Sequence, residues 1–244
     1  VDALDVLLNS AVRQQMMADV PLGAFLSGGV DSSTVVALMQ AQSAQRIKTF
    51  TIGFHEEEYN EAVHAKAVAE HLGTDHTELY VTPQQALDVI PQLPTLYCEP
   101  FADPSQIPTF LVAKLARQQV TVSLSGDAGD ELFCGYSRYL IAEKYWKNLS
   151  WLHPANRQWL ARALALFSPD WLRQTNLGNK LLRGSEVLAA GTLDALYLGM
   201  VSHWQDPASL VIGGNEPPTL LTGLAPELPG LKDVPRMMAL DMQT

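Results

Sequence analysis

The pattern of apolar positions changes between two spacings along the first part of the chain, up to about Leu140. Four short apolar or β-branched runs are typical of buried strands, and apolar residues at three- and four-residue spacing between them predict helices. Strands that alternate with helices of this length indicate an α/β domain, a parallel sheet flanked by helices. The predicted strands are Leu22–Leu26, Thr49–Phe54, His76–Val81 and Val120–Leu124.

Several helix ends carry recognisable signals. Pro21 ends the first helix, and Gly73 is placed to close the third in the left-handed conformation. Thr82-Pro83-Gln84-Gln85 combines a Thr cap, a Pro at the first helical position and a Gln three residues after the cap, and Asp103-Pro104-Ser105-Gln106 repeats that arrangement. The helices predicted around the strands are Ala3–Ala18, Ser32–Gln42, Tyr59–Leu72 and Ile107–Arg117.

Beyond Leu140 the strand signal fades, and helices and loops are expected. The segment Asp206–Pro235 is rich in Pro and Gly, which predicts mostly loop. We expect residues 1–145 to form one domain and residues 146–244 to form a partial C-terminal helical subdomain that extends it. The helices predicted in this part are Ser137–Trp146, Asn156–Phe167, Thr192–His203 and one that starts at Pro235.

Charge and cysteine content narrow the function classes. The chain has 16 Lys and Arg against 26 Asp and Glu, so its formal net charge is 16 − 26 = −10. That excess disfavours a nucleic-acid partner and an anionic membrane surface, and no apolar run is long enough to predict a membrane span. Two cysteines are too few for a disulfide framework or a four-cysteine zinc site, and they fit a reducing compartment such as the cytoplasm. An anionic small molecule stays compatible, because backbone N–H groups hold phosphate without net positive charge.

The segment with the clearest chemistry is Leu26-Ser27-Gly28-Gly29-Val30-Asp31-Ser32-Ser33, which follows a predicted strand and opens a predicted helix. Its glycines permit close backbone approach to a ligand, and the free N–H groups of a helix start favour an anion. The segment lacks the Lys of a Walker A loop, the G-x-G-x-x-G spacing of a dinucleotide fingerprint and the G-x-S-x-G of a nucleophile elbow. A phosphate site without a lysine is therefore predicted, against the plainer interpretation of a Gly-Gly turn capped by Asp31.

A second block identifies the family that the chain resembles. The first segment resembles the pyrophosphate loop of the ATP pyrophosphatases. The block Ser125-Gly126-Asp127-Ala128-Gly129-Asp130-Glu131-Leu132-Phe133-Cys134-Gly135-Tyr136 resembles the S-G-[DE]-G-x-D-E-x-F-x-G-Y motif of the glutamine-hydrolysing asparagine synthetases. Val20-Pro21-Leu22-Gly23 and Thr49-Phe50-Thr51-Ile52-Gly53 also match that branch. The resemblance implies an adenine nucleotide alpha hydrolase-like fold.

The resemblance implies an enzyme, a ligase that uses ATP and Mg²⁺. The β-carboxylate of aspartate would attack the α-phosphate of ATP and release pyrophosphate, and ammonia would then displace AMP to give asparagine. Asp127 and Asp31 would be catalytic, Asp127 as a general base, while Asp31 and Asp130 would bind Mg²⁺. The implied nucleotide contacts are Leu26, Ser27, Gly28, Gly29, Asp31, Ser32, Ser33, Ile52, Ser125 and Gly126. The plainer interpretation of Asp130 and Glu131 is a solvated acidic turn.

The sequence departs from the family at two positions. Ala128 and Cys134 stand where glycines are common, and Ala128 matters if its position needs a positive φ. Cys134 is more simply interpreted as a small buried apolar residue than as a nucleophile.

The chain also lacks the Cys-first glutaminase domain that supplies ammonia in the family and a downstream lysine that contacts pyrophosphate. The chain is therefore expected to hold the ATP site without the complete active site. Partners would be aspartate or another carboxylate, ammonia from a glutaminase domain, and a second copy in a homodimer. Two alternatives stay open: a related amidotransferase or cyclase that activates a peptide, polysaccharide or β-lactam precursor, or a non-catalytic nucleotide-binding module.

Overall fold

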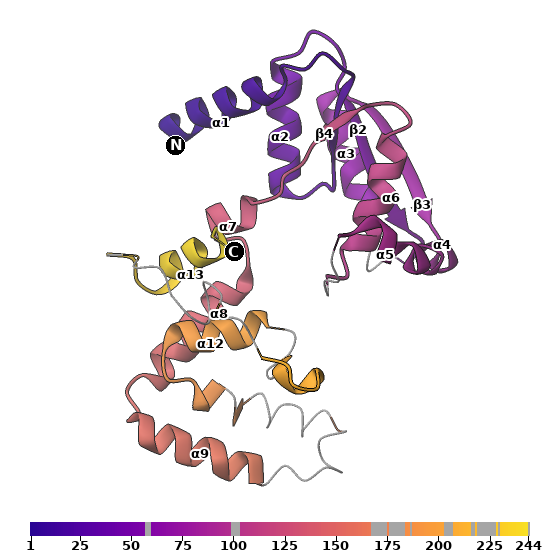
Figure 1. The fold of residues 1–244 in the computed structure, drawn as a ribbon. Helices are drawn as coiled ribbons and strands as arrows, with labels where there is room; N and C mark the ends of the chain where they lie inside the picture. The colour runs from indigo at the N-terminus through magenta and orange to yellow at the C-terminus, as the bar shows by residue number, and fades with distance from the viewer. Residues whose placement is uncertain are drawn as a thin grey trace. The chain divides into compact units, whose positions relative to one another are not determined.

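The chain forms two compact units, Val1–Asp127 and Ala128–Thr244, in the computed structural model drawn in Figure 1. The structure describes residues 1–56, 60–98, 103–166, 175, 184–185, 187–202, 207–215, 218, 228 and 230–243. The boundary between the two units, after Asp127, lies earlier in the chain than the domain boundary predicted after residue 145. That domain boundary stays a prediction. Several predicted positions lie outside the described residues, namely Tyr59, Phe167, His203 and part of Asp206–Pro235.

A parallel sheet of four strands organises the first unit. Its strand order is β3-β2-β1-β4, and all three pairings are parallel. The class predicted from the apolar pattern, α/β with a parallel sheet flanked by helices, is confirmed. Each predicted strand is present to within two residues: β1 Leu22–Phe25, β2 Lys48–Phe54, β3 Asp75–Val81 and β4 Val122–Leu124.

Helices cover both faces of this sheet (Figure 1). Ala24 and Leu26 face one apolar cluster, which contains Val36 from α2 and Ala65 from α3. Phe50 faces the opposite cluster with residues of α6. Helices of the first two crossovers therefore lie on one face, and the helix that leads back to β4 lies on the other. The helices of this unit are α1 Asp2–Gln15, α2 Val30–Ala41, α3 Ala62–Leu72, α4 Pro83–Leu87, η2 Ile90–Gln92, α5 Leu93–Leu96 and α6 Gln106–Ala116.

The helix-end signals had different outcomes. Gly73 closes α3 at φ 72°, and Thr82 forms the predicted capping box with Gln85 at the start of α4. The matching prediction at Asp103 is wrong. The Asp103 carboxylate accepts from the N–H of Ser105 at 2.8 Å, two residues on, so a turn precedes α6 and its N-cap residue Ser105 makes no side-chain cap bond.

The strand order creates a switch point beside β1. The chain leaves β1 toward β2 on one side, while β4 pairs on the other side with the register Leu22 to Val122 and Ala24 to Leu124. Because these strands are parallel, the loops that follow β1 and β4 leave the sheet at the same carboxyl edge. In open α/β sheets this edge is where ligands bind.

In its described residues the second unit is built from helices joined by turns and loops, with no strand, as predicted. Its core is a cluster around the fully buried Tyr139 and Tyr197. The other buried members come from three helices and include Ala142, Leu196 and Met237. Its elements are α7 Gly129–Phe133, α8 Ser137–Leu149, α9 Pro154–Leu166, α12 Leu193–Val201, η3 Pro207–Leu210 and α13 Asp233–Asp241.

Candidate nucleotide site

The loop after β1 is held in shape by its own hydroxyl groups. The Oγ of Ser27 lies 2.9 Å from the Oγ of Ser32 and accepts from the N–H of Gly29 at 3.2 Å. The backbone N–H of Ser27 donates to the Ser32 hydroxyl at 3.2 Å. The chain then enters α2, where Ser33 N–H bonds to Gly29 O at 3.1 Å. The predicted phosphate-loop residues thus form one compact turn at a helix start.

Gly28 is the position of this loop where glycine is required. Its φ is +82°, and a Cβ there would lie 2.7 Å from the backbone of His64 and Ala65 in α3. Real Cβ atoms do not approach backbone atoms that closely, and a positive φ is strained for other residues. The loop therefore packs directly on α3, and this contact fixes its direction.

The loop after β4 meets the loop after β1. A Cβ on Gly126 would lie 2.7 Å from the backbone N of Ser32 and 3.1 Å from the Cβ of Asp31. The Ser125 hydroxyl donates to the Asp127 carboxylate at 2.9 Å, which orients that exposed side chain. Within the first unit, the structure thus brings the start of the second segment, Ser125–Asp127, against the loop after β1.

Leu26 and Ile52 lie at the ends of neighbouring strands. The Leu26 side chain is 1% exposed in the apolar core, and its N–H donates to Phe50 O at 2.9 Å. Only main-chain atoms of Leu26 are therefore available to a ligand. Ile52 lies in β2 and is partly exposed.

The predicted metal ligands lie in different units. Asp31 is in the first turn of α2, whose N-cap is Gly29 without a side-chain bond, so Asp31 does not cap the helix. Asp130 lies in α7 of the second unit. Neither carboxylate has an ion pair with any described residue, and no group of three metal-ligating side chains occurs in the described part of the chain. Their pairing on one Mg²⁺ stays a prediction.

The two departures from the family motif are both at positive φ. Ala128 has φ 69° at the start of α7, and Cys134 has φ 60° at its end. Glycine adopts this conformation without strain, whereas a Cβ there costs roughly 1–2 kcal/mol. The concern raised for Ala128 therefore holds, and it applies equally to Cys134, which is partly buried with a free thiol.

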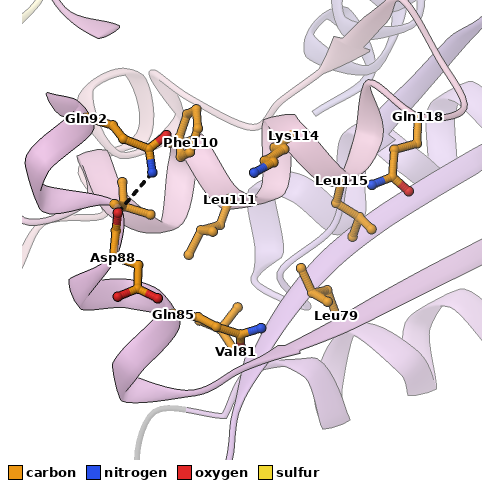
Figure 2. A pocket seen from close by; sticks show the side chains of 11 residues that line it. Leu79, Val81, Gln85, Asp88, Gln92, Phe110, Leu111, Lys114, Leu115 and Gln118 are labelled. Atoms are coloured by element: carbon orange, nitrogen blue, oxygen red, sulfur yellow. Dashed lines mark hydrogen bonds between the residues drawn. The ribbon is translucent and has the colours of Figure 1, made fainter. Parts of the chain in front are cut away.

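A separate cavity of about 400 Å³ lies between β3, the α4–η2 segment and α6 (Figure 2). Its floor is apolar, with Leu79, Leu111 and Leu115, while Lys114 and Asp88 stand at its rim. None of the predicted site residues lines it. It is a feature distinct from the paired loops.

The arrangement of the two loops is typical of a broad class of nucleotide-binding proteins. Two Gly- and Ser-containing loops meet at the switch point of an open parallel sheet, and one of them opens a helix, as in doubly wound nucleotide-binding α/β proteins. Within that class the chain belongs to the asparagine synthase family, because the family model described as asparagine synthase matches residues 3–244.

Individual relatives match a little over half of the chain. A Methanocaldococcus jannaschii protein provisionally named glutamine-hydrolysing asparagine synthetase 2 is 45% identical over 135 residues, which is 55% of this chain and 26% of that protein. Glutamine-hydrolysing asparagine synthetase 1 of Bacillus subtilis is 40% identical over 129 residues, 53% of this chain and 20% of that protein. The chain spans about a quarter or less of the length of these relatives.

One solved structure overlaps more of the chain at low similarity. The NH3-dependent NAD synthetase of Campylobacter jejuni aligns with 75% of this chain and 90% of its own, at 12% identity and a TM-score of 0.39. No helix among the described residues is long and apolar enough to cross a membrane.

Proposed function

We propose that this chain carries the ATP-binding part of an enzyme that forms an amide bond by adenylating the side-chain carboxylate of aspartate. The observation that carries the proposal is the contact between Gly126 and the first turn of α2, at 2.7 Å from an ideal Cβ to Ser32 N. This contact supports a site formed by the loop after β1 and the start of the second motif, both in the first unit. Membership of the asparagine synthase family supports the reaction class.

The loop after β1 would hold the pyrophosphate of ATP. Ser27, Gly28, Gly29, Ser32 and Ser33 supply hydroxyl and N–H donors, and the amino end of α2 adds its dipole. Donors fixed in this way favour charge that develops on the leaving pyrophosphate. Main-chain atoms at Leu26 and Ile52 would contact the adenine, and Ser125 with Gly126 would line the α-phosphate side.

The carboxylates would have separate roles. Asp127, oriented by Ser125, would serve as the general base toward the attacking ammonia. Asp31 and Asp130 would bind Mg²⁺, which suits their type, since Mg²⁺ takes one or two carboxylates together with phosphate oxygens, and neither has a cation partner in the described chain. When bound, Mg²⁺ would neutralise charge on the phosphates. Asp31 would contribute to catalysis by binding Mg²⁺.

Pyrophosphate release tests the proposal. In the full-length protein we expect release that requires ATP, Mg²⁺ and aspartate, and asparagine formation when ammonia or glutamine is added. Replacing Asp127→Asn should slow asparagine formation about 100-fold, the lower range for losing a general base. Normal pyrophosphate release by Asp31→Ala or normal turnover by Asp127→Asn would remove those roles.

The identity of the carboxylate is tested separately. ATP–pyrophosphate exchange against a panel of carboxylic acids should show a response to aspartate. Exchange with a peptide or β-amino acid instead would favour the related amidotransferases or cyclases. Calorimetric binding of ATP with no exchange for any acid would favour a non-catalytic nucleotide-binding module.

A further inference from the structure

The short helix α7 carries Asp130 and Glu131 but has little to hold it by itself. It contains five residues, none of them buried, and both its flanking residues have positive φ. Isolated helices of this length are not stable, because nucleation costs more than one turn of hydrogen bonds returns. Strained backbone also persists only where the surroundings fix it. The fixing contacts must therefore come from outside the helix.

Two contacts hold α7 from its carboxyl side. The Tyr136 hydroxyl donates to the Glu131 carboxylate at 2.9 Å, and the Gly135 N–H donates to Asp130 O at 2.9 Å. A methyl group on Gly135 would also overlap the Asp130 carboxyl, with 2.8 Å to its Cγ, so that side chain lies over the Gly135 backbone. The orientation of both acidic residues thus depends on where residues 135 and 136 lie.

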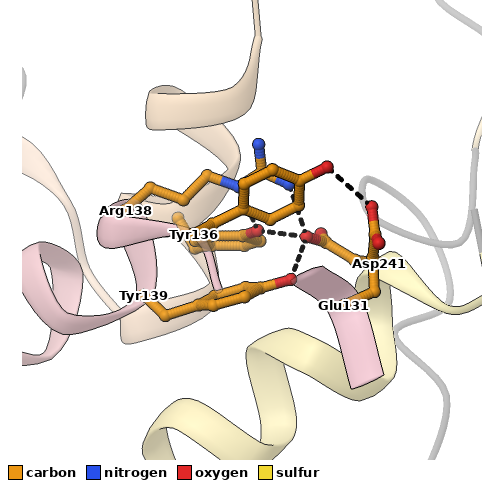
Figure 3. A network of polar contacts seen from close by, with 6 residues as sticks. Glu131, Tyr136, Arg138, Tyr139 and Asp241 are labelled. Atoms are coloured by element: carbon orange, nitrogen blue, oxygen red, sulfur yellow. Dashed lines mark hydrogen bonds and ion pairs between the residues drawn. The ribbon is translucent and has the colours of Figure 1, made fainter. Parts of the chain in front are cut away.

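Tyr136 is itself held by a partly buried polar network (Figure 3). The guanidinium of Arg138 stacks on the Tyr136 ring, 3.7 Å from its centroid, and donates to the Asp241 carboxylate at 2.8 Å. The same oxygen of Asp241 accepts from Tyr139 and Tyr197, each at 2.6 Å. The network joins α8, α12 and α13. The stacked Arg138 adds Tyr136, the N-cap residue of α8, whose hydrogen bond to Glu131 reaches α7.

The pKa values of Tyr136 and Arg138 are both raised. Burial raises the pKa of Tyr136 to about 12, and its hydrogen bond to Glu131 acts in the same direction. Burial lowers the pKa of Arg138, but hydrogen bonds to Asp241 and Tyr197 outweigh it, so that pKa is raised. Tyr136 therefore remains a donor and Arg138 a cation throughout the physiological range.

We propose that Tyr136 and Arg138 are positioning residues that hold α7, and with it the Asp130 carboxylate, in the orientation that binds Mg²⁺. The proposal rests on the proposed function, which assigns Asp130 to the metal. Neither residue would touch the metal or the nucleotide. Groups that orient metal ligands through hydrogen bonds alter metal affinity when they are removed.

The discriminating variant is Tyr136→Phe, which keeps the ring under Arg138 and removes only the bond to Glu131. In the full-length protein the Mg²⁺ concentration for half-maximal pyrophosphate release should rise about 10-fold at saturating ATP. Arg138→Lys should change it in the same direction, since Lys keeps the charge but loses the planar stack and fork. Hydrogen exchange at the Gly129–Phe133 amides should become faster in both variants.

Two matched Tyr→Phe variants separate positioning from stability. Tyr139→Phe loses a phenol–carboxylate bond of similar length in the core, so it should lower the thermal midpoint without changing the Mg²⁺ dependence. Tyr145→Phe, on the exposed side of α8, should change neither. Equal Mg²⁺ responses in Tyr136→Phe and Tyr139→Phe, or none in Tyr136→Phe, overturn the proposal.

The hydrogen-exchange measurement keeps the two proposals distinguishable. If the unmodified protein releases no pyrophosphate, the proposed function fails on its own. Unchanged α7 exchange in Tyr136→Phe then overturns the positioning role as well. Faster α7 exchange in that variant supports the hold on α7.

Discussion

The two units of the chain are specified by different kinds of contact. The sheet unit is built from apolar side chains on alternate strand positions, such as Ala24 and Phe25, which face opposite clusters. The helical unit also has an apolar core, but a partly buried carboxylate with three donors, Asp241, lies at the junction of its helices. A second ion pair, Arg236 with Asp194 at 2.8 Å, joins α13 to α12.

The two kinds of contact differ in how strictly they limit each unit to one packing arrangement. A parallel strand that slips by one residue exchanges the faces of its side chains, so that Ala24 and Phe25 would each meet the cluster that now receives the other. Helices packed through apolar side chains tolerate rearrangement more easily, whereas a satisfied polar network accepts one geometry. We therefore expect backbone crowding to be most damaging in the sheet unit and loss of a charge in the helical unit.

The largest expected effect is that of Gly28→Ala in the sheet unit. The new Cβ adds both an unfavourable φ and a clash with the α3 backbone, so we expect a loss of about 4 kcal/mol of stability. Hydrogen exchange of the β1 and β2 amides measures it. Gly73→Ala is the matched control, because its φ is +72° but nothing lies within 4 Å of its Cβ. Equal losses of stability in the two variants would show that the positive φ causes the loss and that the contact with α3 does not.

Asp241→Asn should come next, in the helical unit. The amide keeps the shape but leaves Arg138 without its counter-charge, at a cost of roughly 2–3 kcal/mol. All five tryptophans of the sequence follow residue 128, so denaturation monitored by tryptophan emission reports this unit. The control Glu143→Gln breaks a surface pair with Lys147 and should cost less than about 0.5 kcal/mol. A similar loss of stability in both variants would show that Asp241 contributes no more than a surface ion pair.

Glycine at the two departures from the family motif should stabilise the helical unit. Ala128→Gly and Cys134→Gly each relieve a left-handed backbone, and we expect a gain of about 1 kcal/mol apiece after the entropy cost of glycine. The same tryptophan transition measures it. Ala195→Gly, in the exposed side of α12 with ordinary helical backbone, should instead lose up to about 1 kcal/mol. A loss in all three variants would contradict the strain assigned to α7.

The smallest effect is a pH dependence in the sheet unit. His76 bonds through Nδ1 to Thr49 Oγ1 at 2.9 Å, and burial, the largest cause, lowers its pKa from the ordinary 6.5. The unfolded chain therefore binds a proton more readily below pH 6.5, so stability falls as pH decreases from there toward the lowered pKa. The measurement is the denaturant concentration at the midpoint of unfolding, followed by hydrogen exchange of the β-sheet amides. Its difference between pH 7.5 and pH 5.5 should be smaller in His76→Gln than in the unmodified protein. If His76→Gln leaves the difference between the two pH values unchanged, the pH dependence of stability comes from other groups.

Local patterns in the sequence predicted the sheet unit well. Strand periods, the Gly73 cap and the Thr82 capping box depend on residues within a few positions of one another, and all appear in the structure. The prediction at Asp103 was wrong because the same residues form either a helix cap or a turn. Pattern alone does not decide between these two bonds.

The candidate site was predictable where it depends on motifs and not where it depends on long contacts. The loops at Ser27 and Ser125 were found because each follows a predicted strand. The network behind α7 joins residues 102 to 103 positions apart, such as Tyr139 and Arg138 with Asp241. No local pattern encodes such a contact, and the sequence showed Asp241 only as part of the last helix. The positive φ of Cys134 was likewise visible only as a missing glycine.

The pairing of β1 with β4 also orders events during synthesis. Leu22 pairs with Val122, so 122 − 22 = 100 residues separate the two partners. The strands β1, β2 and β3 leave the ribosome early and pair in chain order, whereas β4 must close a long loop before it docks. The edge of β1 that receives β4 is unpaired until then, and unpaired edges attract other strands. The nascent chain is therefore most exposed to misassociation in the interval that ends when Gly126 reaches α2.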